Sequence, residues 1–329
     1  MIGVKLEFIT ILKGESSKMK KGNKFKGAIK GLSSVLVLTA GIFAMYPGST
    51  FAKNVDKPKI EFGVVPDAQY CDCDPSGTKY YRNSLEKLAD AAQTFNERKL
   101  RFTIQLGDLI DRDMSSFDQI LPVYEMIEGK KYHVLGNHDF PEPSDTIVER
   151  LGMKNQYYDF KQKNWRFIVL DSNDLSFYAN PKGSEKYQQA QEMYDSIKAK
   201  GDINAQTWNG GISEEQLDWL KNVLKKAKKA NEKVIVFSHM PVYPENSHNI
   251  WNDEAVIKEL ESSGNVVAYF NGHNHAGNYG KKNGIHYVNL KGMLETADTN
   301  TYSIIEIYKD RIFIDGYGLE QDRVLPFEK

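Results

Sequence analysis

Five short apolar runs, each followed at once by polar residues, constrain the fold of this sequence more than any other feature. They are four to six residues long and rich in β-branched or aromatic residues, which is typical of buried strands. The polar segments after them are Asp67-Ala-Gln69, Gly107-Asp108-Leu-Ile-Asp111, Gly136-Asn137-His138-Asp139, Ser238-His239 and Gly272-His273-Asn-His275. Because open α/β sheets build their sites at the carboxyl ends of strands, these segments predict one shared site.

The remaining periodicity predicts an α/β chain in which strands alternate with helices. The nine expected strands cover 60–65, 101–106, 132–135, 165–170, 234–237, 266–270, 286–290, 303–308 and 311–314. The five expected helices cover 84–98, 116–128, 185–199, 213–229 and 253–262. Ser213 and Gln216 have the spacing of a capping box, which predicts where the fourth of these helices begins.

The histidines are concentrated in the polar segments. Of the seven histidines in the chain, four follow the strands: His138, His239, His273 and His275. A single histidine after a strand is most often structural, but four beside carboxylates and amides at matching strand ends predict a metal site. His133 and His286 lie inside expected strands and are interpreted as core residues, whereas His248 is a candidate for the pocket entrance.

The first 52 residues have the pattern of a secretory signal region. Lysines up to Lys30 are followed by an apolar stretch over 32–46, and Thr50 and Ala52 stand at the −3 and −1 positions of a small-residue cleavage site. Met19 opens a normal signal peptide, so we expect translation to start there and residues 53–329 to form one catalytic domain, secreted or at the cell surface. The alternative is an uncleaved membrane anchor, although the apolar stretch is shorter than the roughly 20 residues that span a bilayer.

The charge of the expected mature chain limits its partners. Of 43 basic and 44 acidic residues, eight Lys and two Glu fall in 1–52, which leaves 35 basic and 42 acidic residues and a net charge of −7. Nucleic acids and anionic membranes bind basic faces, so we expect no nucleic-acid partner and no membrane contact except through an uncleaved signal segment. An acidic protein can still bind phosphates where cations supply positive charge.

The chain has two cysteines, Cys71 and Cys73. One residue separates them, which is too close for an ordinary disulfide, so we expect free thiols in a loop. We also expect a core that is stable without disulfides, even in an exported protein.

In chain order the polar segments read Asp-x-Gln, Gly-Asp-x-x-Asp, Gly-Asn-His-Asp, His and Gly-His-x-His. This order resembles the signature of the calcineurin-like metallophosphoesterases. The segments 77–85, 208–213, 238–244 and 287–297 are similar to those of a narrower group, the manganese-dependent ADP-ribose/CDP-alcohol diphosphatases, and the resemblance extends over 58–325. It implies a four-layer αββα sandwich with metals at the strand ends.

Two departures bear on this resemblance. The wider superfamily has His where this chain has Gln69, and the diphosphatase group has Gln, which favours the narrower assignment. Eukaryotic members of that group are not built around an export signal. The resemblance therefore implies the chemistry of the reaction but not the physiological substrate.

The resemblance implies two divalent cations bridged by Asp108. Asp67, Gln69 and His275 would complete one cation site, and Asn137, His239 and His273 the other. Carboxylate, amide and imidazole ligands without thiolate favour Mn²⁺, with Fe and Zn as alternatives.

Further residues are expected to act on the substrate. His138 would serve as acid or hydrogen-bond donor at the leaving oxygen, and Asp111 would orient it, with an ordinary loop cap as the alternative for Asp111. Arg82 and Arg112 are candidates for holding the second phosphate, or else are surface ion pairs. Four aromatic residues are candidates for stacking a nucleobase: Tyr80, Tyr81, Trp208 and Tyr243.

Three functions remain open from the sequence. The leading hypothesis is hydrolysis of a small nucleotide, the diphosphate bond of ADP-ribose-like or CDP-alcohol-like molecules, by metal-activated water. The second is a broad extracellular phosphomonoesterase or phosphodiesterase. The third is a secreted metal-binding module without activity, against which the intact ligand set and His138 argue.

Overall fold

A computed structural model describes residues 56–143 and 146–327 of the chain. The predicted signal region 1–52, with its start at Met19 and its cleavage site, lies outside these residues. Within the described ranges, every helix is too short or too polar to cross a membrane.

The first of two six-stranded sheets has the strand order β12-β11-β10-β1-β2-β3. Three neighbouring strands are parallel: β1 (Ile60–Val65), β2 (Phe102–Gln105) and β3 (Lys130–His133). Three antiparallel strands from the end of the chain complete it: β10 (Thr301–Ile307), β11 (Arg311–Gly318) and β12 (Arg323–Pro326). The predicted first strand therefore lies at the centre of its sheet.

The second sheet has the order β4-β5-β6-β7-β9-β8. Its four central strands are parallel: β5 (Trp165–Val169), β6 (Lys233–Phe237), β7 (Val266–Asn271) and β9 (Ile285–Asn289). Antiparallel strands β4 (Tyr158–Gln162) and β8 (Asn278–Lys282) form its two edges.

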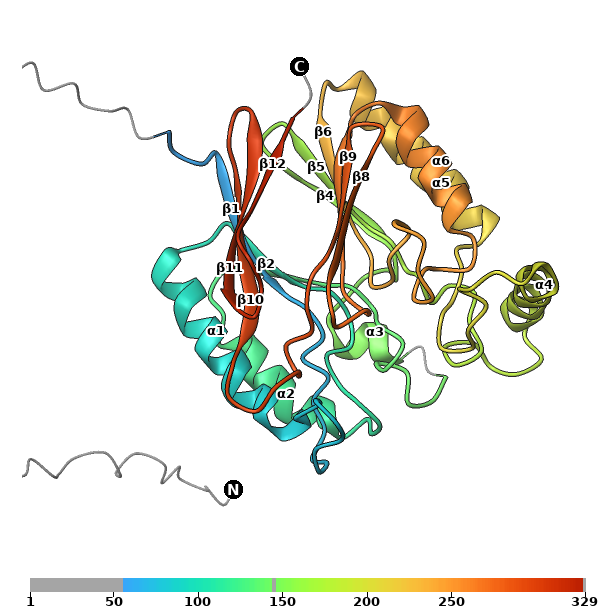
Figure 1. Cartoon of the computed structure of the whole chain (residues 1–329), viewed down its shortest axis with the longest axis horizontal. Coiled ribbons are helices and arrows are strands. Elements are labelled where there is room, and N and C mark those ends of the chain that lie inside the picture. Colours follow the sequence, from blue (N-terminus) through green and yellow to red (C-terminus); the bar gives the residue numbers. More distant parts are fainter. Residues whose placement is uncertain (1–55, 144–145, 328–329) are drawn as a thin grey trace, which may run out of the picture. The chain divides into compact units, whose positions relative to one another are not determined.

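The helices cover the outer faces of the two sheets (Figure 1). Helices α1 (Ser84–Arg98) and α2 (Ser116–Glu125) pack on the first sheet, and α5 (Glu214–Lys229) and α6 (Asp253–Ser263) on the second. A single 3₁₀ turn, Tyr81–Asn83, leads into α1, α3 (Thr146–Arg150) is one short turn, and α4 (Glu185–Lys200) packs on a small cluster around Trp251. The four-layer αββα prediction is confirmed.

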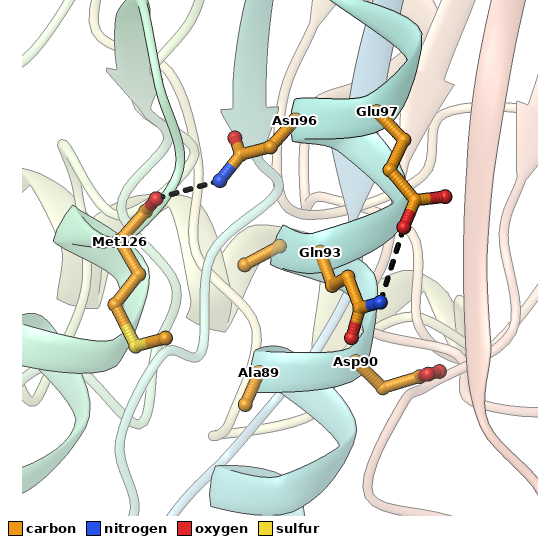
Figure 2. Close-up of a pocket in the computed structure, with 7 residues that line it drawn as sticks. Ala89, Asp90, Gln93, Asn96, Glu97 and Met126 are labelled. Atoms are coloured by element: carbon orange, nitrogen blue, oxygen red, sulfur yellow. Dashed lines mark hydrogen bonds between the residues drawn. The ribbon is translucent and has the colours of Figure 1, made fainter.

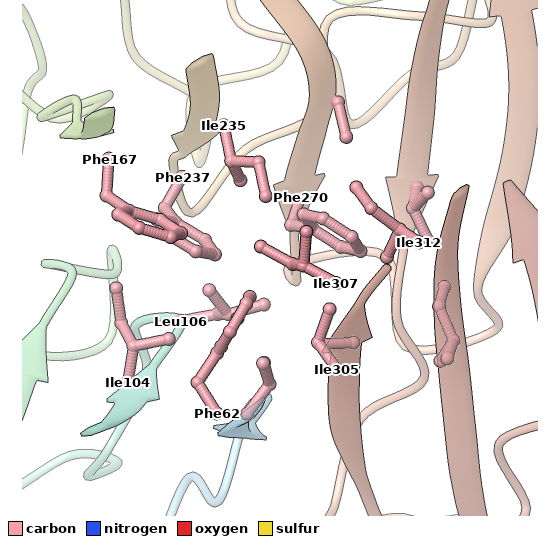
Figure 3. Packing of buried hydrophobic residues seen from close by; sticks show 14 of the residues in the cluster. Phe62, Ile104, Leu106, Phe167, Ile235, Phe237, Phe270, Ile305, Ile307 and Ile312 are labelled. Atoms are coloured by element: carbon pink, nitrogen blue, oxygen red, sulfur yellow. The ribbon is translucent and has the colours of Figure 1, made fainter. Parts of the chain in front are cut away.

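The main hydrophobic core lies between the sheets, where aromatic rings from both sheets meet (Figure 3). Phe62 of the first sheet lies 5.7 Å from Phe167 and 5.9 Å from Phe237 of the second, measured between ring centroids. Along β6, Ile235 packs in this core and the adjacent Val236 packs under the helices. Because both faces of these strands are buried, the strands read as continuous apolar runs and were predictable from sequence.

Three strands and one short helix were not predicted. The strands β4 and β8 are edge strands with polar, partly exposed residues, so they lack the apolar run that marks a buried strand. The turn Asn283-Gly284 before β9 is a hairpin signal that could have revealed β8.

The predicted capping box at the start of α5 is half formed. The Ser213 side chain accepts a hydrogen bond from the backbone N–H of Gln216, but the Gln216 side chain binds the backbone of Asp171 instead of that of Ser213.

The expectation of free cysteines is wrong. Cys71 and Cys73 form a disulfide in the loop after β1, where the chain folds back and brings their Cα atoms to 5.2 Å. This separation is within the ordinary range for a disulfide, so one intervening residue is enough once the loop is bent. Cys71 is buried against Tyr81 and Leu294. The expectation that the core is stable without a disulfide stays a prediction.

Candidate metal centre

The predicted metal ligands come from loops at the carboxyl ends of five strands. Strands β1, β2 and β3 are neighbours in one sheet, and β6 and β7 are neighbours in the other, so their loops meet at one edge of the sandwich. Four of the ligand residues have positive φ angles, a region that side chains other than glycine seldom adopt: Asp67 (42°), Gln69 (43°), Asp108 (52°) and His273 (69°). Backbone strain gathered in this way is typical of a functional site.

Two glycines allow these loops to approach one another. A side chain at Gly136 would collide with the backbone and carboxylate of Asp108, and one at Gly272 would collide with the carboxylate of Asp67. The glycines of Gly-Asn-His and Gly-His-x-His are therefore required because the ligand loops pack against them.

The first group of ligands surrounds the Nε2 atom of His239. This atom lies 3.2 Å from Asp108 Oδ2, 3.1 Å from Asn137 Oδ1 and 3.1 Å from His273 Nδ1. Two ligands that bind one cation at about 2.1–2.2 Å and at right angles lie about 3 Å apart, so these separations fit a shared cation. Asp108, His239 and His273 are all buried.

The second group joins Asp67 and His275 to the same Asp108, and the Gln69 backbone N–H donates to the Asp108 carbonyl at 2.7 Å. Single ligand atoms of Asp67, Asp108 and His275 lie within 4.8 Å of one another. Asp67 Oδ2 and Gln69 Oε1 are buried, and neither has a hydrogen-bond partner in the part of the chain that is described. Because unpaired buried oxygens are costly, these two atoms fit a cation that accepts their lone pairs. The two groups share Asp108, as a bridging ligand requires.

Hydrogen bonds outside the ligand groups orient the three imidazoles. His239 Nδ1 donates to the Leu106 carbonyl at 2.8 Å, and His273 Nε2 donates to Asn209 Oδ1 at 2.9 Å. His275 Nδ1 donates to Glu295 Oε1 at 2.9 Å. In each ring the other nitrogen is left with its lone pair facing the ligand group, which is how proteins prepare histidines for a metal.

Sequence reasoning did not single out Asn209 or Glu295. The Asn209 amide donates to the carbonyls of Asn204 and Ser247, which turns its Oδ1 toward His273. Both residues lie inside the segments 208–213 and 287–297 that carried the family resemblance, and this was the available signal.

Asp139 is a third residue whose position was not anticipated. Its carboxylate accepts backbone N–H groups from Gly136, Asp108, Leu109 and Ile110, at 2.8–3.3 Å. Burial and the nearby Asp108 raise the pKa of Asp139 to about 7, against the lowering effect of these N–H donors. Asp139 therefore ties the loop after β2 to the loop after β3.

His138 lies beside the ligand groups with its ring partly exposed. Its backbone N–H donates to Asp108 Oδ1 at 2.8 Å, and its Nδ1 lies 3.0 Å from Asp111 Oδ1, which is the expected carboxylate–imidazole pairing. Burial lowers the pKa of His138, but Asp108 and Asp111 raise it by more, so the net shift is upward. A raised pKa favours the protonated imidazole that an acid requires.

A cavity of about 350 Å³ opens above these residues. Five of the predicted site residues line it: Asp108, Asn137, His138, His273 and His275. His248, the candidate for the entrance, also lines it, together with Trp208, whose side chain is 45% exposed, and with Lys79. The volume is in the range of small-molecule sites.

Comparisons with known proteins agree with this geometry. Residues 62–277 match the sequence family described as calcineurin-like phosphoesterase. This chain belongs to the calcineurin-like phosphoesterases. It is therefore a metal-dependent hydrolase of phosphoric ester or diphosphate bonds, and the hypothesis of an inactive metal-binding module is set aside.

Individual relatives cover most of this phosphoesterase. The manganese-dependent ADP-ribose/CDP-alcohol diphosphatase of Xenopus laevis is 30% identical over 330 residues, which cover 84% of this chain and 93% of that protein. The human protein of the same name is 31% identical over 319 residues, which cover 82% of this chain and 93% of the human protein. A dimetal phosphatase from Danio rerio has a solved structure with a TM-score of 0.76 and 28% identity, covering 83% of this chain and 100% of that one.

The three residues predicted to bind substrate in this phosphoesterase do not line the cavity. Arg82 is exposed and forms ion pairs with Asp72 and Asp74. The exposed guanidinium of Arg112 lies over the Tyr81 ring, 5.3 Å from its centroid. The ring of Tyr243 packs 5.3 Å from the ring of Tyr287 and lines a different groove, beside α4 and α6. The structure thus favours the surface interpretation for both arginines.

A separate hollow of about 680 Å³ lies on the outer surface of α1 (Figure 2). Its walls are Ala89, Asp90, Gln93, Asn96, Glu97 and Met126, together with Ala92. Gln93 is hydrogen-bonded to Glu97, and Asn96 to the Met126 carbonyl. No grouping of metal ligands was found there among the described residues, so the chemistry of this phosphoesterase is assigned to the cavity at the strand ends.

Proposed function

We propose that this phosphoesterase hydrolyses the diphosphate bond of nucleotides such as ADP-ribose or CDP-alcohols, with two divalent cations and preferentially with Mn²⁺. The observation that carries the proposal is the pair of ligand groups sharing Asp108, in a chain whose relatives bear the name of that activity. A small polar cavity over this pair suits a phosphorylated small molecule better than a polymer.

The proposed ligands form two cation sites, which correspond to the two groups of side chains described above. Asp67, Gln69 and His275 would hold one cation with Asp108, and Asn137, His239 and His273 the other. When bound, the cations would neutralise charge on the phosphate and lower the pKa of an attacking water. The imidazole tautomers set by Leu106, Asn209 and Glu295 leave the required lone pairs free.

In the proposed reaction a water oxygen forms a bond to one phosphorus of the diphosphate. The bond from that phosphorus to the bridging oxygen breaks, and its electron pair leaves with the second phosphate. His138, held by Asp111, is placed to give that oxygen a proton, and it regains the proton from solvent while the water loses its own to solvent. The products are two phosphate monoesters.

Trp208 and His248 are the residues best placed to contact the nucleoside part of the substrate. Both line the cavity, and the exposed face of an indole is a common surface for stacking a base. This assignment replaces Tyr243, which packs on Tyr287 outside the cavity.

We also propose that the protein is exported, because residues 19–52 have the pattern of a signal peptide. The disulfide between Cys71 and Cys73 supports this proposal, since disulfides persist mainly in oxidising compartments outside the cytosol. The substrate would then be an extracellular nucleotide.

Substrate profiling with Mn²⁺ tests the proposed activity. Kinetics for ADP-ribose and a CDP-alcohol should be compared with those for AMP and p-nitrophenyl phosphate. Each charge-assisted hydrogen bond to the second phosphate is worth about 1.5–3 kcal/mol, so two such bonds would raise kcat/KM for the diphosphates by about 100-fold or more. Equal or better hydrolysis of the monoesters would leave a broad phosphomonoesterase as the function.

A further inference from the structure

Lys79 brings a positive charge to the cavity from outside the metal-ligand loops. It lines the cavity together with Asp108, His138 and His275, and its side chain is half-buried. Within residues 56–143 and 146–327, no hydrogen bond or ion pair engages its ammonium group. Because Lys79 lines this cavity, an ammonium without a protein partner has three donors available for a ligand there.

The backbone around Lys79 is held in place. Lys79 and Ser76 exchange two backbone hydrogen bonds of 3.0 Å each, which closes a tight turn. Lys79 also forms an isolated antiparallel bridge with Glu295, flanked by a 2.9 Å bond from Tyr80 N–H to the Leu294 carbonyl. Because Glu295 binds His275, the Lys79 backbone is joined to the residue that orients a metal ligand.

The electrostatic influence of Lys79 reaches both sides of the cavity. Burial lowers the pKa of His248, and the charges of His275, His239 and Lys79 lower it further. At His138, burial and Lys79 lower the pKa, against the stronger raising effects of Asp108 and Asp111. The ammonium therefore lies within electrostatic range of His248 and of the proposed acid, His138.

Arg82 follows Lys79 by three residues but differs from it in having protein partners and in its position outside the cavity. Its guanidinium is engaged by Asp72 and Asp74, and it does not line the cavity. The cation that this loop offers to a ligand is therefore Lys79.

We propose that Lys79 binds the departing phosphate of a diphosphate substrate and thereby selects diphosphates over simple monoesters. This inference rests on the proposed diphosphatase function and names the residue that would give it its selectivity. A monoester with an alcohol leaving group has no second phosphate for Lys79. Removing the ammonium should therefore weaken diphosphate binding alone, by about 10- to 100-fold for one charge-assisted contact.

The test compares Lys79→Met and Lys79→Arg in the Mn²⁺-loaded enzyme. Calorimetry would measure the affinity for α,β-methylene-ADP, whose carbon bridge cannot be hydrolysed, and for AMP, which has one phosphate. Lys225→Met is the matched control, because Lys225 is exposed on α5 and does not line the cavity. Manganese content and kcat/KM for ADP-ribose and p-nitrophenyl phosphate would be measured on the same preparations.

We expect Lys79→Met to weaken binding of α,β-methylene-ADP while leaving AMP affinity and manganese content unchanged, and Lys79→Arg to restore most of the loss. Unchanged affinity for the analogue, or an equal loss for both ligands, would overturn the proposal. Failure of the wild-type enzyme to prefer ADP-ribose over p-nitrophenyl phosphate would instead refute the diphosphatase function, and the binding comparison would still decide the role of Lys79.

Discussion

Glu295 accepts a 2.9 Å hydrogen bond from Nδ1 of His275, and this bond turns the other ring nitrogen of His275 toward Asp67. His275 Nε2 lies 3.7 Å from Asp67 Oδ1, so the two atoms are placed to bind one cation between them. The hydrogen bond also keeps the Glu295 carboxylate ionised: it lowers the pKa of Glu295, against the raising effect of partial burial.

We predict that Glu295→Ala weakens binding of the cation at Asp67, Gln69 and His275 by about 10- to 100-fold, the usual cost of losing a residue that orients a metal ligand. Manganese titration of the variant would show one site weakened and the other retained. Glu295→Gln is the control, because its side-chain oxygen can still accept the Nδ1 hydrogen bond. Equal affinity for Glu295→Ala and the wild type would show that His275 needs no support.

The sequence was enough to predict the metal ligands, but not the loop residues that support them. The ligands follow buried strands, and an apolar run with Asp or His at its end is visible without a structure, as at Val65 before Asp67 or Phe237 before His239. Asn209 lies in the loop between α4 and α5, and Glu295 lies six residues past the end of β9, so neither stands directly at a strand end. Only three-dimensional contact with His273 and His275 reveals them.

The sequence analysis did not single out Lys79, the proposed phosphate contact, for a related reason. Arginine matches phosphate geometry, which favoured Arg82, but the acidic partners Asp72 and Asp74 on the same loop engage its guanidinium. The same bend of this loop brings Cys71 and Cys73 together, and one-residue spacing gives no sign of it.

His133 should make the stability of the protein depend on pH. Burial, and then the charge of Lys131, lower its pKa to about 4, whereas in the unfolded chain it is about 6.5. The unfolded chain therefore binds the proton more tightly, and stability is full above pH 6.5 and declines as the pH falls from there toward 4. Between pH 7 and pH 5 this group should cost about 2 kcal/mol of the free energy of unfolding.

Urea unfolding of the wild type and of His133→Gln at pH 7 and pH 5, under the same metal conditions, would measure this effect. Other groups titrate equally in both proteins, so the variant should lose less stability on acidification than the wild type. Parallel losses would mean that His133 is already protonated in the folded state or accessible to water.

The proposed export makes a prediction about the mature N-terminus. We expect the chain recovered from the culture medium or the cell surface to begin at Lys53, following cleavage after Ala52. Intact mass and N-terminal sequencing would identify the first residue. A cytosolic protein that retains Met19 or Met1 would refute export and remove the reason to expect an extracellular substrate.

The central claim is that Asp108 joins two cation sites while His138 acts on the substrate without holding a cation. Elemental analysis of manganese-loaded protein, with kcat measured on the same samples, tests this claim most directly. We predict two manganese ions per wild-type chain, loss of most metal and of activity in Asp108→Asn, and full metal with activity lowered by about 100-fold or more in His138→Ala. A His138→Ala protein that loses metal as completely as Asp108→Asn would contradict the account.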